Sequence, residues 1–308
     1  MIQLREPNQT DIGLARMAAL QLFVAFIWGG TWVAGRILSH EIPPLAAGAW
    51  RIFFGALTLG YLVWRKERQF PPVRMKDARS VVLMGVTGIF AYSLCFFYGV
   101  QHIQAGRGAL VVALNPVVIA LAAALFLGER LAPKKILGIV IAMLGCLFVI
   151  GRGNPLALLH GEVGIGELFI FCCVLCWTTY TLIGRRAGST LPPLVMTFYA
   201  SLAGGILLIG AGVFEGALRE WPRLSWQGWL SLLYLGVLNN GFSYVWYAQG
   251  IVQLGATRAA AFTNLVPISA LFFGAVLLGE HVGLSVLFGG ALVLGGVWLT
   301  NRPVAKGT

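Results

Sequence analysis

Charged residues are scarce in this sequence. They make up 11% of its 308 residues, while 58% are hydrophobic. A soluble domain has roughly 25% charged and about 45–50% apolar residues, so this balance excludes an ordinary soluble protein. A helix of about twenty apolar residues crosses the roughly 30 Å hydrocarbon core of a bilayer. Ten such windows, which leave no room for a soluble domain, lie at residues 17–38, 44–64, 79–100, 105–126, 134–151, 164–186, 193–214, 226–249, 256–278 and 282–300.

Carboxylates are missing from the interior of these windows, where Glu167, near the outer end of window 164–186, comes closest. Coupling to a proton or sodium gradient usually leaves an intramembrane carboxylate, so the sequence favours movement of a solute without tight ion coupling. The phosphate-binding pattern Gly-x-x-x-x-Gly-Lys-Ser/Thr is also absent. This excludes ATP hydrolysis by the chain.

Catalytic and metal-binding clusters are lacking as well. The four histidines are scattered at the ends of the windows, and a membrane-embedded enzyme needs clustered acid, base or nucleophile groups. Cys173 and Cys176, preceded by Cys172, have a spacing found in redox and zinc sites, but no second ligand pair accompanies them. We therefore expect free thiols there and at Cys95 and Cys146, and neither an enzyme, a metal nor a cofactor.

The net charge of +11 does not indicate a nucleic-acid partner, because the basic residues lie between the apolar windows rather than on one soluble face. They indicate orientation instead, since cytoplasmic segments are enriched in Lys and Arg. With a cytoplasmic N-terminus the basic residues outside are few: Arg36, Arg107, Arg152, Arg219 and Arg223. Those inside are many: Arg5, Arg16, Arg65, Lys66, Arg68, Arg74, Lys76, Arg79, Arg130, Lys134, Lys135, Arg185, Arg186, Arg258, Arg302 and Lys306. We expect both termini in the cytoplasm and no cleaved signal peptide.

One sequence pattern occurs twice. Residues 28–45 read WGGTWVAGRILSHEIPPL and residues 177–194 read WTTYTLIGRRAGSTLPPL; later, NPVVIALAAALFLGERL (115–131) matches VPISALFFGAVLLGEHV (266–282). The halves are residues 17–151 and 164–300, with a linker at 152–163 and cytoplasmic tails at 1–16 and 301–308. Because each half has five helices, the second is inverted relative to the first. Such a repeat favours alternating access to a midplane site, although a duplicated static scaffold or receptor is the alternative.

Aromatic and hydroxyl side chains form stripes at helical spacing in both halves. Trp28, Thr31 and Trp32 share one face of the first window, and the equivalent residues of the sixth are Trp177, Tyr180 and Thr181. In the eighth window the stripe is Asn240, Ser243, Tyr244 and Tyr247, and its equivalent in the third contains Tyr92, Ser93 and Phe96. Together the stripes predict a cavity for a small, partly apolar solute. Simple helix packing, with the polar groups bonding neighbouring helices, is the alternative.

Proline and glycine mark the fourth and ninth windows. Asn115-Pro116 and Asn264 with Pro267 predict a bend in each helix, because proline removes a backbone donor. A bend there can be a hinge or a fixed kink, and Asn115 and Asn264 are candidate site residues. The pairs Gly128-Glu129 and Gly279-Glu280 are interpreted as helix stops, with glycine in the left-handed cap and the glutamate beginning the next helix.

Arg51 is the one charge that these windows place well inside a span. Its insertion costs about 2.5–3.5 kcal/mol or more and demands a partner. A carboxylate of the solute or a helix-end carbonyl can be that partner. The equivalent residue, Ala200, is uncharged.

The two five-helix repeats, the stretch AAGAWRIFFGAL (46–57), GALVVALNPVVIALAAALFLGERL (108–131) and its echo ATRAAAFTNLVPISALFFGAVLLGEHV (256–282) resemble the drug/metabolite transporter superfamily, closest to its EamA-type ten-helix exporters. The resemblance spans about residues 17–300. It implies alternating access in a bacterial inner membrane, with an amino acid (aromatic ones included) as the cargo. We also expect lipid around the chain and one chain as the transporting unit. Drugs, nucleosides and other metabolites are the alternative cargo.

Overall fold

The computed structural model describes residues 9–128, 131–154, 164–186, 191–217, 223–254, 259 and 262–301, and all regular structure within these ranges is helical. The described helices begin and end close to the expected windows; where they differ most, α1 starts earlier and α13 starts later. They are α1 (Gln9–Glu41), α2 (Pro44–Glu67), α3 (Met75–Met84), η1 (Gly85–Ala91), α4 (Tyr92–His102), α5 (Ala105–Val112), α6 (Asn115–Leu127), α7 (Pro133–Ile150), α8 (Ile165–Arg186), α9 (Pro193–Phe214), α10 (Trp226–Leu233), η3 (Tyr234–Ser243), α11 (Tyr244–Leu254), α13 (Leu265–Leu278) and α14 (Leu284–Asn301).

Proline and glycine set several of these boundaries. Pro44 and Pro193, from the repeated Pro-Pro-Leu, open α2 and α9, where the fixed φ of proline suits the first turn and no N–H is needed. Gly128 and Gly279 end α6 and α13 in the left-handed conformation, with φ of 70° and 64°. The predicted glycine stops are therefore confirmed.

The chain is a helical membrane protein. Seven helical stretches are long and apolar enough to cross a bilayer, and α13 and α14 are shorter apolar helices. Large apolar side chains point outward along them, for example Phe26, Leu144 and Ile206, which suits a lipid environment. The seven stretches are Gly13–Glu41, Pro44–Glu67, Asp77–His102, Ala105–Leu127, Pro133–Ile150, Ile165–Gly184 and Pro193–Phe214.

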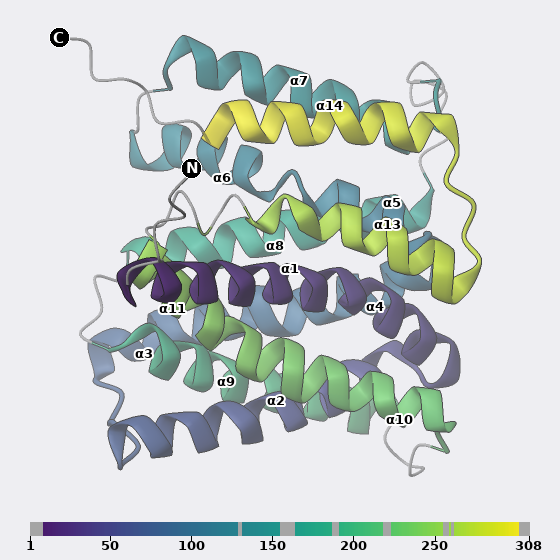
Figure 1. Ribbon diagram of the computed structural model, residues 1–308. Helices are drawn as coiled ribbons and strands as arrows, with labels where there is room; N and C mark the ends of the chain where they lie inside the picture. The colour runs from purple at the N-terminus through teal and green to yellow at the C-terminus, as the bar shows by residue number, and fades with distance from the viewer. Residues whose placement is uncertain are drawn as a thin grey trace, which may run out of the picture.

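Helices α7 and α14, the last of each half, lie side by side at one edge of the bundle (Figure 1). Their contact is backbone to backbone: a Cβ on Gly145 would lie 2.7 Å from the Gly289 carbonyl oxygen, and one on Gly296 would lie 2.6 Å from that of Gly138. Gly138 and Gly145 are the repeat equivalents of Gly289 and Gly296. Small residues let membrane helices approach closely, and the glycines of the stretch 289–296 allow this contact.

Other contacts between the halves also come in equivalent pairs. Helix α1 packs on α13 as α8 packs on α5 and α6, and α2 packs on η3 as α9 packs on η1. The segments η1 and η3 are wide π-helical turns at equivalent places in the third and eighth windows. Insertions of this kind occur often at functional sites. The first turns of α1 and the last turns of α14 lie at the same end of the bundle (Figure 1).

Candidate functional site

Aromatic rings from both halves meet near the middle of α8. The Trp177 ring lies 5.2 Å from Tyr180 of the same helix, 6.1 Å from Tyr92 of α4 and 6.3 Å from Tyr244 of α11, measured between ring centroids. All four side chains are partly exposed. Rings at these separations attract one another beyond the area that they bury.

The same row continues to α1. The Trp28 ring lies 6.0 Å from Tyr244 and 5.0 Å from Tyr247, and its indole Nε1 donates a 2.8 Å hydrogen bond to Ser243 Oγ. The Ser243 hydroxyl in turn donates to the Asn239 carbonyl. We call the partly exposed rings of this row the aromatic cluster: Trp28, Tyr92, Trp177, Tyr180, Tyr244 and Tyr247.

Four of the other predicted site residues lie behind this cluster. Trp32, Ser93, Phe96 and Ser243 are each at most 3% exposed, and the Trp32 and Phe96 rings are 5.4 Å apart. They support the cluster rather than face open space.

Arg51 of α2 lies against Ser93 and Phe96 of this layer. Its guanidinium donates a 2.8 Å hydrogen bond to Ser93 Oγ and lies over the rings of Phe96 and Phe97. The sequence predicted a carboxylate of the solute or a helix-end carbonyl as the partner of this charge. The partner found is a hydroxyl with two aromatic rings.

The remaining predicted polar groups are used locally. The Thr31 and Thr181 hydroxyls donate to the carbonyls of Ile27 (3.1 Å) and Trp177 (2.8 Å), one turn earlier. Asn240 accepts a 3.3 Å hydrogen bond from the Asn239 amide. Its Cβ lies against Gly55 of α2, so Asn240 lies at the contact between η3 and α2.

The two predicted bends are interruptions in the helices. Between α5 and α6 the chain makes a turn at residues 113–114, and Pro116 lies in the first turn of α6. Asn264 caps α13, which contains Pro267 in its first turn. The Oδ1 atom of Asn115 is buried and has no hydrogen-bond partner among the described residues. Whether the interruptions act as hinges stays a prediction.

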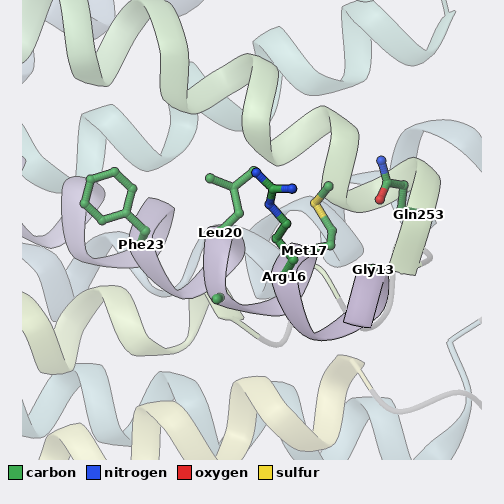
Figure 2. A pocket seen from close by; sticks show the side chains of 7 residues that line it. Gly13, Arg16, Met17, Leu20, Phe23 and Gln253 are labelled. Atoms are coloured by element: carbon green, nitrogen blue, oxygen red, sulfur yellow. The ribbon is translucent and has the colours of Figure 1, made fainter. Parts of the chain in front are cut away.

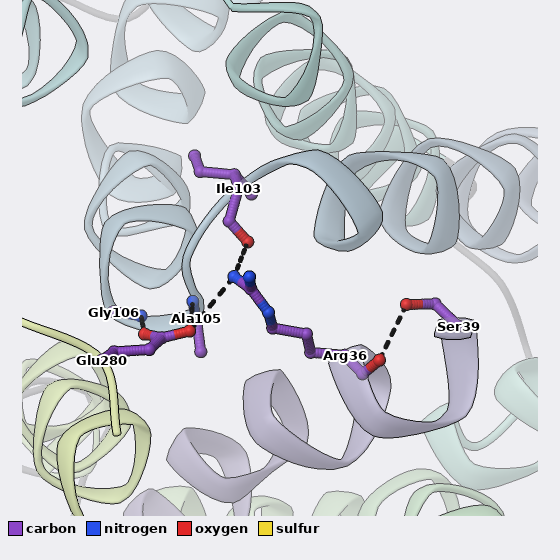
Figure 3. A network of polar contacts seen from close by, with 6 residues as sticks. All are labelled: Arg36, Ser39, Ile103, Ala105, Gly106 and Glu280. Atoms are coloured by element: carbon purple, nitrogen blue, oxygen red, sulfur yellow. Dashed lines mark hydrogen bonds and ion pairs between the residues drawn. The ribbon is translucent and has the colours of Figure 1, made fainter. Parts of the chain in front are cut away.

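An ion-pair network lies at the end of the bundle that carries the α1–α2 turn, here called the outer end. Glu280, just after α13, lies 3.1 Å from Arg36 of α1 and accepts hydrogen bonds from the backbone N–H groups of Ala105 (2.8 Å) and Gly106 (3.4 Å). Arg36 also donates to the Ile103 carbonyl at 2.6 Å (Figure 3). The interpretation of Glu280 as the start of the next helix was wrong: α14 begins at Leu284, and the helix dipole that Glu280 meets is that of α5.

A second ion pair lies close by. Arg107 of α5 is 2.7 Å from Glu167 of α8 and donates to the carbonyls of Val149 and Ile150 at the end of α7. Neither ion pair was predicted from the sequence. The available signal was the recurrence of charge at equivalent helix ends, Arg36 with Arg185 and Glu280 with Glu129, although the side chains of Arg185 and Glu129 lie outside the described residues.

A surface pocket of about 580 Å³ lies between the first turns of α1 and the end of α11 (Figure 2). It is at the opposite end of α1 from Arg36 and is separate from the aromatic cluster. It is lined by Gly13, Arg16, Met17, Ala19, Leu20, Phe23 and Gln253.

All five cysteines are free thiols; Cys146 and Cys173 are buried, and Cys95, Cys172 and Cys176 are partly buried. In the part of the chain that the structure describes, no group of three or more His, Cys, Asp or Glu side chains is placed to hold a metal ion.

Comparisons with known proteins agree with this architecture. The chain is 28% identical to YyaM, an uncharacterized transporter of Bacillus subtilis (strain 168), over 90% of both chains. It is 29% identical to a probable terminal-alkyne amino-acid exporter of Streptantibioticus cattleyicolor, over 74% of this chain and 75% of the other. A solved crystal structure has the same fold, with a TM-score of 0.63 and 19% identity over 92% of this chain and 98% of the other.

A family model covers most of the sequence in two separate matches. The model of the EamA-like transporter family matches residues 16–151 and again residues 164–302. The chain belongs to the EamA-like transporter family.

Proposed function

We propose that this transporter exports small metabolites, with amino acids as the first candidates, from the cytoplasm across a bacterial inner membrane. The observation that carries the proposal is the aromatic cluster. It combines equivalent helices of both halves, its rings are partly exposed, and uncharged hydroxyls lie among them. An aromatic surface with a few hydrogen-bonding groups suits a small, partly apolar solute.

The proposed architecture is ten membrane-spanning helices in two inverted repeats, residues 17–151 and 164–300, with both termini in the cytoplasm and one chain as the transporting unit. Three observations support the two repeats and the shared side of the termini: the double match to the family model, the reciprocal glycine contacts of α7 and α14, and the shared end of α1 and α14 (Figure 1). Halves related by a pseudo-twofold axis give similar energies to inward-open and outward-open arrangements.

Alternating access requires one entrance to be closed while the other opens. The two ion pairs hold α1, α5, α8 and the chain after α13 together at the outer end, which is the periplasmic side in the proposed topology. We infer that opening toward the periplasm separates the Arg36–Glu280 pair, with the interruptions near Pro116 and Pro267 as hinges. The sequence places no carboxylate well inside a membrane-spanning window, which supports export without tight ion coupling.

Amino acids are preferred as cargo for two reasons. One relative carries the name of an amino-acid exporter, and the cluster offers ring faces for apolar and aromatic side chains. Phosphate esters are disfavoured because Arg51 has no second buried cation beside it among the described residues.

The test is flux from proteoliposomes that contain the purified protein, with a panel of labelled amino acids, nucleosides and cationic drugs. We expect flux of at least one amino acid, lowered about tenfold by Trp28→Ala or Tyr244→Ala, since an aromatic contact is worth about 1 kcal/mol or more. Trp64→Ala, at an exposed tryptophan of α2, is the matched control. No flux of any amino acid would refute the cargo, and unchanged flux in both cluster variants would refute the site.

A further inference from the structure

Arg51 is a buried charge whose hydrogen-bonding capacity is mostly unused. The residue is 4% exposed, and its Nε atom is buried without a hydrogen-bond partner. A guanidinium carries five N–H donors, and among the described residues only the Ser93 hydroxyl accepts from it. Burial of unpaired donors and of a net charge is costly, and intramembrane charges that persist usually serve function.

The two phenylalanine rings do not complete this coordination. The guanidinium carbon lies 5.4 Å from the Phe96 centroid and 5.3 Å from that of Phe97. A cation over a ring is stabilised by the ring quadrupole, but a ring face offers no lone pair comparable to a carboxylate oxygen and no negative charge. The rings hold the guanidinium in place and leave it without a counter-ion.

Among the described residues, no printed contact gives Arg51 a carboxylate partner. The titratable groups that interact with its charge include Tyr92, Tyr244 and Cys173. The acids of the two described ion pairs, Glu167 and Glu280, are at the outer end. Tyr92 and Tyr244 belong to the aromatic cluster, so the unpaired charge lies directly behind the proposed cargo site.

We propose that Arg51 binds the carboxylate of the cargo and thereby makes the transporter selective for small carboxylates, which rests on the proposed function. Arg51 lacks a negative partner and enough hydrogen-bond acceptors, and a carboxylate supplies both. Its two oxygens match the planar fork of the guanidinium. The amino group of an amino acid then lies against the ring faces of the cluster, which attract cations.

The experiment compares acids with their amides as competitors. Purified full-length protein in proteoliposomes exchanges labelled L-phenylalanine or L-leucine, and each unlabelled acid is titrated against L-phenylalaninamide or L-leucinamide. A hydrogen bond to a charged group favours the acid by about tenfold to a hundredfold in the wild type. In Arg51→Gln this advantage shrinks to about threefold or less, whereas Arg51→Lys keeps part of it, because a lysine retains the charge without the fork. Arg65→Gln, at an exposed arginine of the same helix, keeps the wild-type advantage.

Each outcome decides the proposal. Amides that compete as well as acids in the wild type, or an acid advantage that survives Arg51→Gln, overturn it. Where Arg51→Gln does not assemble, Ser93→Ala takes its place, because it removes the hydrogen bond that orients the guanidinium; an unchanged acid advantage there overturns the proposal.

A binding measurement distinguishes failure of the amino-acid cargo proposal from failure of the Arg51 proposal. If no labelled amino acid moves, thermal stabilisation of the detergent-solubilised protein by 3-phenylpropionate is compared with stabilisation by 3-phenylpropionamide. Stabilisation by the acid alone, lost in Arg51→Gln, supports carboxylate recognition without amino-acid transport. Equal effects of the acid and the amide overturn it.

Discussion

The two halves of the chain share a frame and differ in what they place around the centre. Gly138 and Gly145 of α7 meet Gly289 and Gly296 of α14 in reciprocal backbone contacts. The equivalent helices α2 and α9 carry Arg51 and Ala200: the first is a charge held by Ser93, and the second is fully buried beside Gly85. Duplication has preserved the contacts between backbones, which tolerate no change in size, while the side chains around the centre have diverged.

The tryptophans at the centre show the same divergence. Trp28 and Trp177 occupy equivalent positions, as do Ser243 and Tyr92. Trp28 donates a hydrogen bond to Ser243, whereas Trp177 meets Tyr92 edge to face at 6.1 Å. One equivalent contact is a hydrogen bond and the other is a contact of two rings, so the two sides of the aromatic cluster, here called its walls, differ chemically.

The largest expected effect comes from breaking the shared frame. In Gly296→Leu the new side chain meets the backbone of Gly138 and Ala142. Overpacking of this kind costs roughly 1–3 kcal/mol or more, and we expect a fall in the melting temperature of the purified protein in detergent. Gly145→Leu, at the equivalent position, lowers it by a similar amount.

The neighbouring glycine provides the control. A Cβ on Gly295 would meet no neighbouring side chain or helix within 4 Å, so Gly295→Leu leaves the melting temperature close to that of the wild type. Equal effects at 295 and 296, or a large difference between 145 and 296, would contradict the reciprocal packing of α7 and α14.

A smaller effect is expected at the outer end. Glu280→Gln keeps the shape of the side chain but removes the charge that faces Arg36 and the start of α5. A hydrogen bond to a charged group is worth about 1.5–3 kcal/mol, so the outer end opens more often. The measurement is labelling of a cysteine at Ser39, a buried residue near this end of α1, by an impermeant maleimide, which becomes several-fold faster.

Two acids serve as controls for this variant. Glu215→Gln, at an exposed residue after α9, leaves the labelling rate unchanged. Glu129, the repeat equivalent of Glu280, lies on the cytoplasmic side in the proposed topology, and Glu129→Gln does not accelerate labelling at residue 39. Labelling that is unaffected by Glu280→Gln would remove the outer ion pair from the proposed gate.

Much of the frame follows from local sequence. Helix α9 has the predicted bounds, 193–214, because an apolar run begins after Pro-Pro and ends in polar residues. Helix α1 begins at Gln9 rather than at residue 17, since polar residues extend a helix without adding to an apolar window. The π-helical segments η1 and η3 were not predicted from the sequence. They coincide with packing against α9 and α2, respectively, and no residue type marks them.

The candidate site was predictable to the extent that helical periodicity determines it. Trp28 and Tyr244 lie on stripes that the 3.6-residue repeat reveals, and the structure brings the stripes together. The Arg36–Glu280 pair joins residues 244 positions apart. Sequence shows that each lies at a helix end, but only the packing of the two halves decides that they meet.

The smallest expected effect tests the difference between the two walls. Ser243→Ala removes the hydroxyl that accepts from Trp28, and Trp28→Phe removes the donor, so each costs about 1 kcal/mol of stability or cargo affinity. If the lost hydrogen bond causes the effect of each single variant, the double variant loses little more stability or affinity than either one. A double-mutant cycle then gives a coupling energy of about 1 kcal/mol. The matched cycle with Tyr92→Phe and Trp177→Phe gives a smaller coupling, because Phe at residue 92 preserves the ring contact. Equal couplings in the two cycles would mean that the walls differ in sequence without differing in strength.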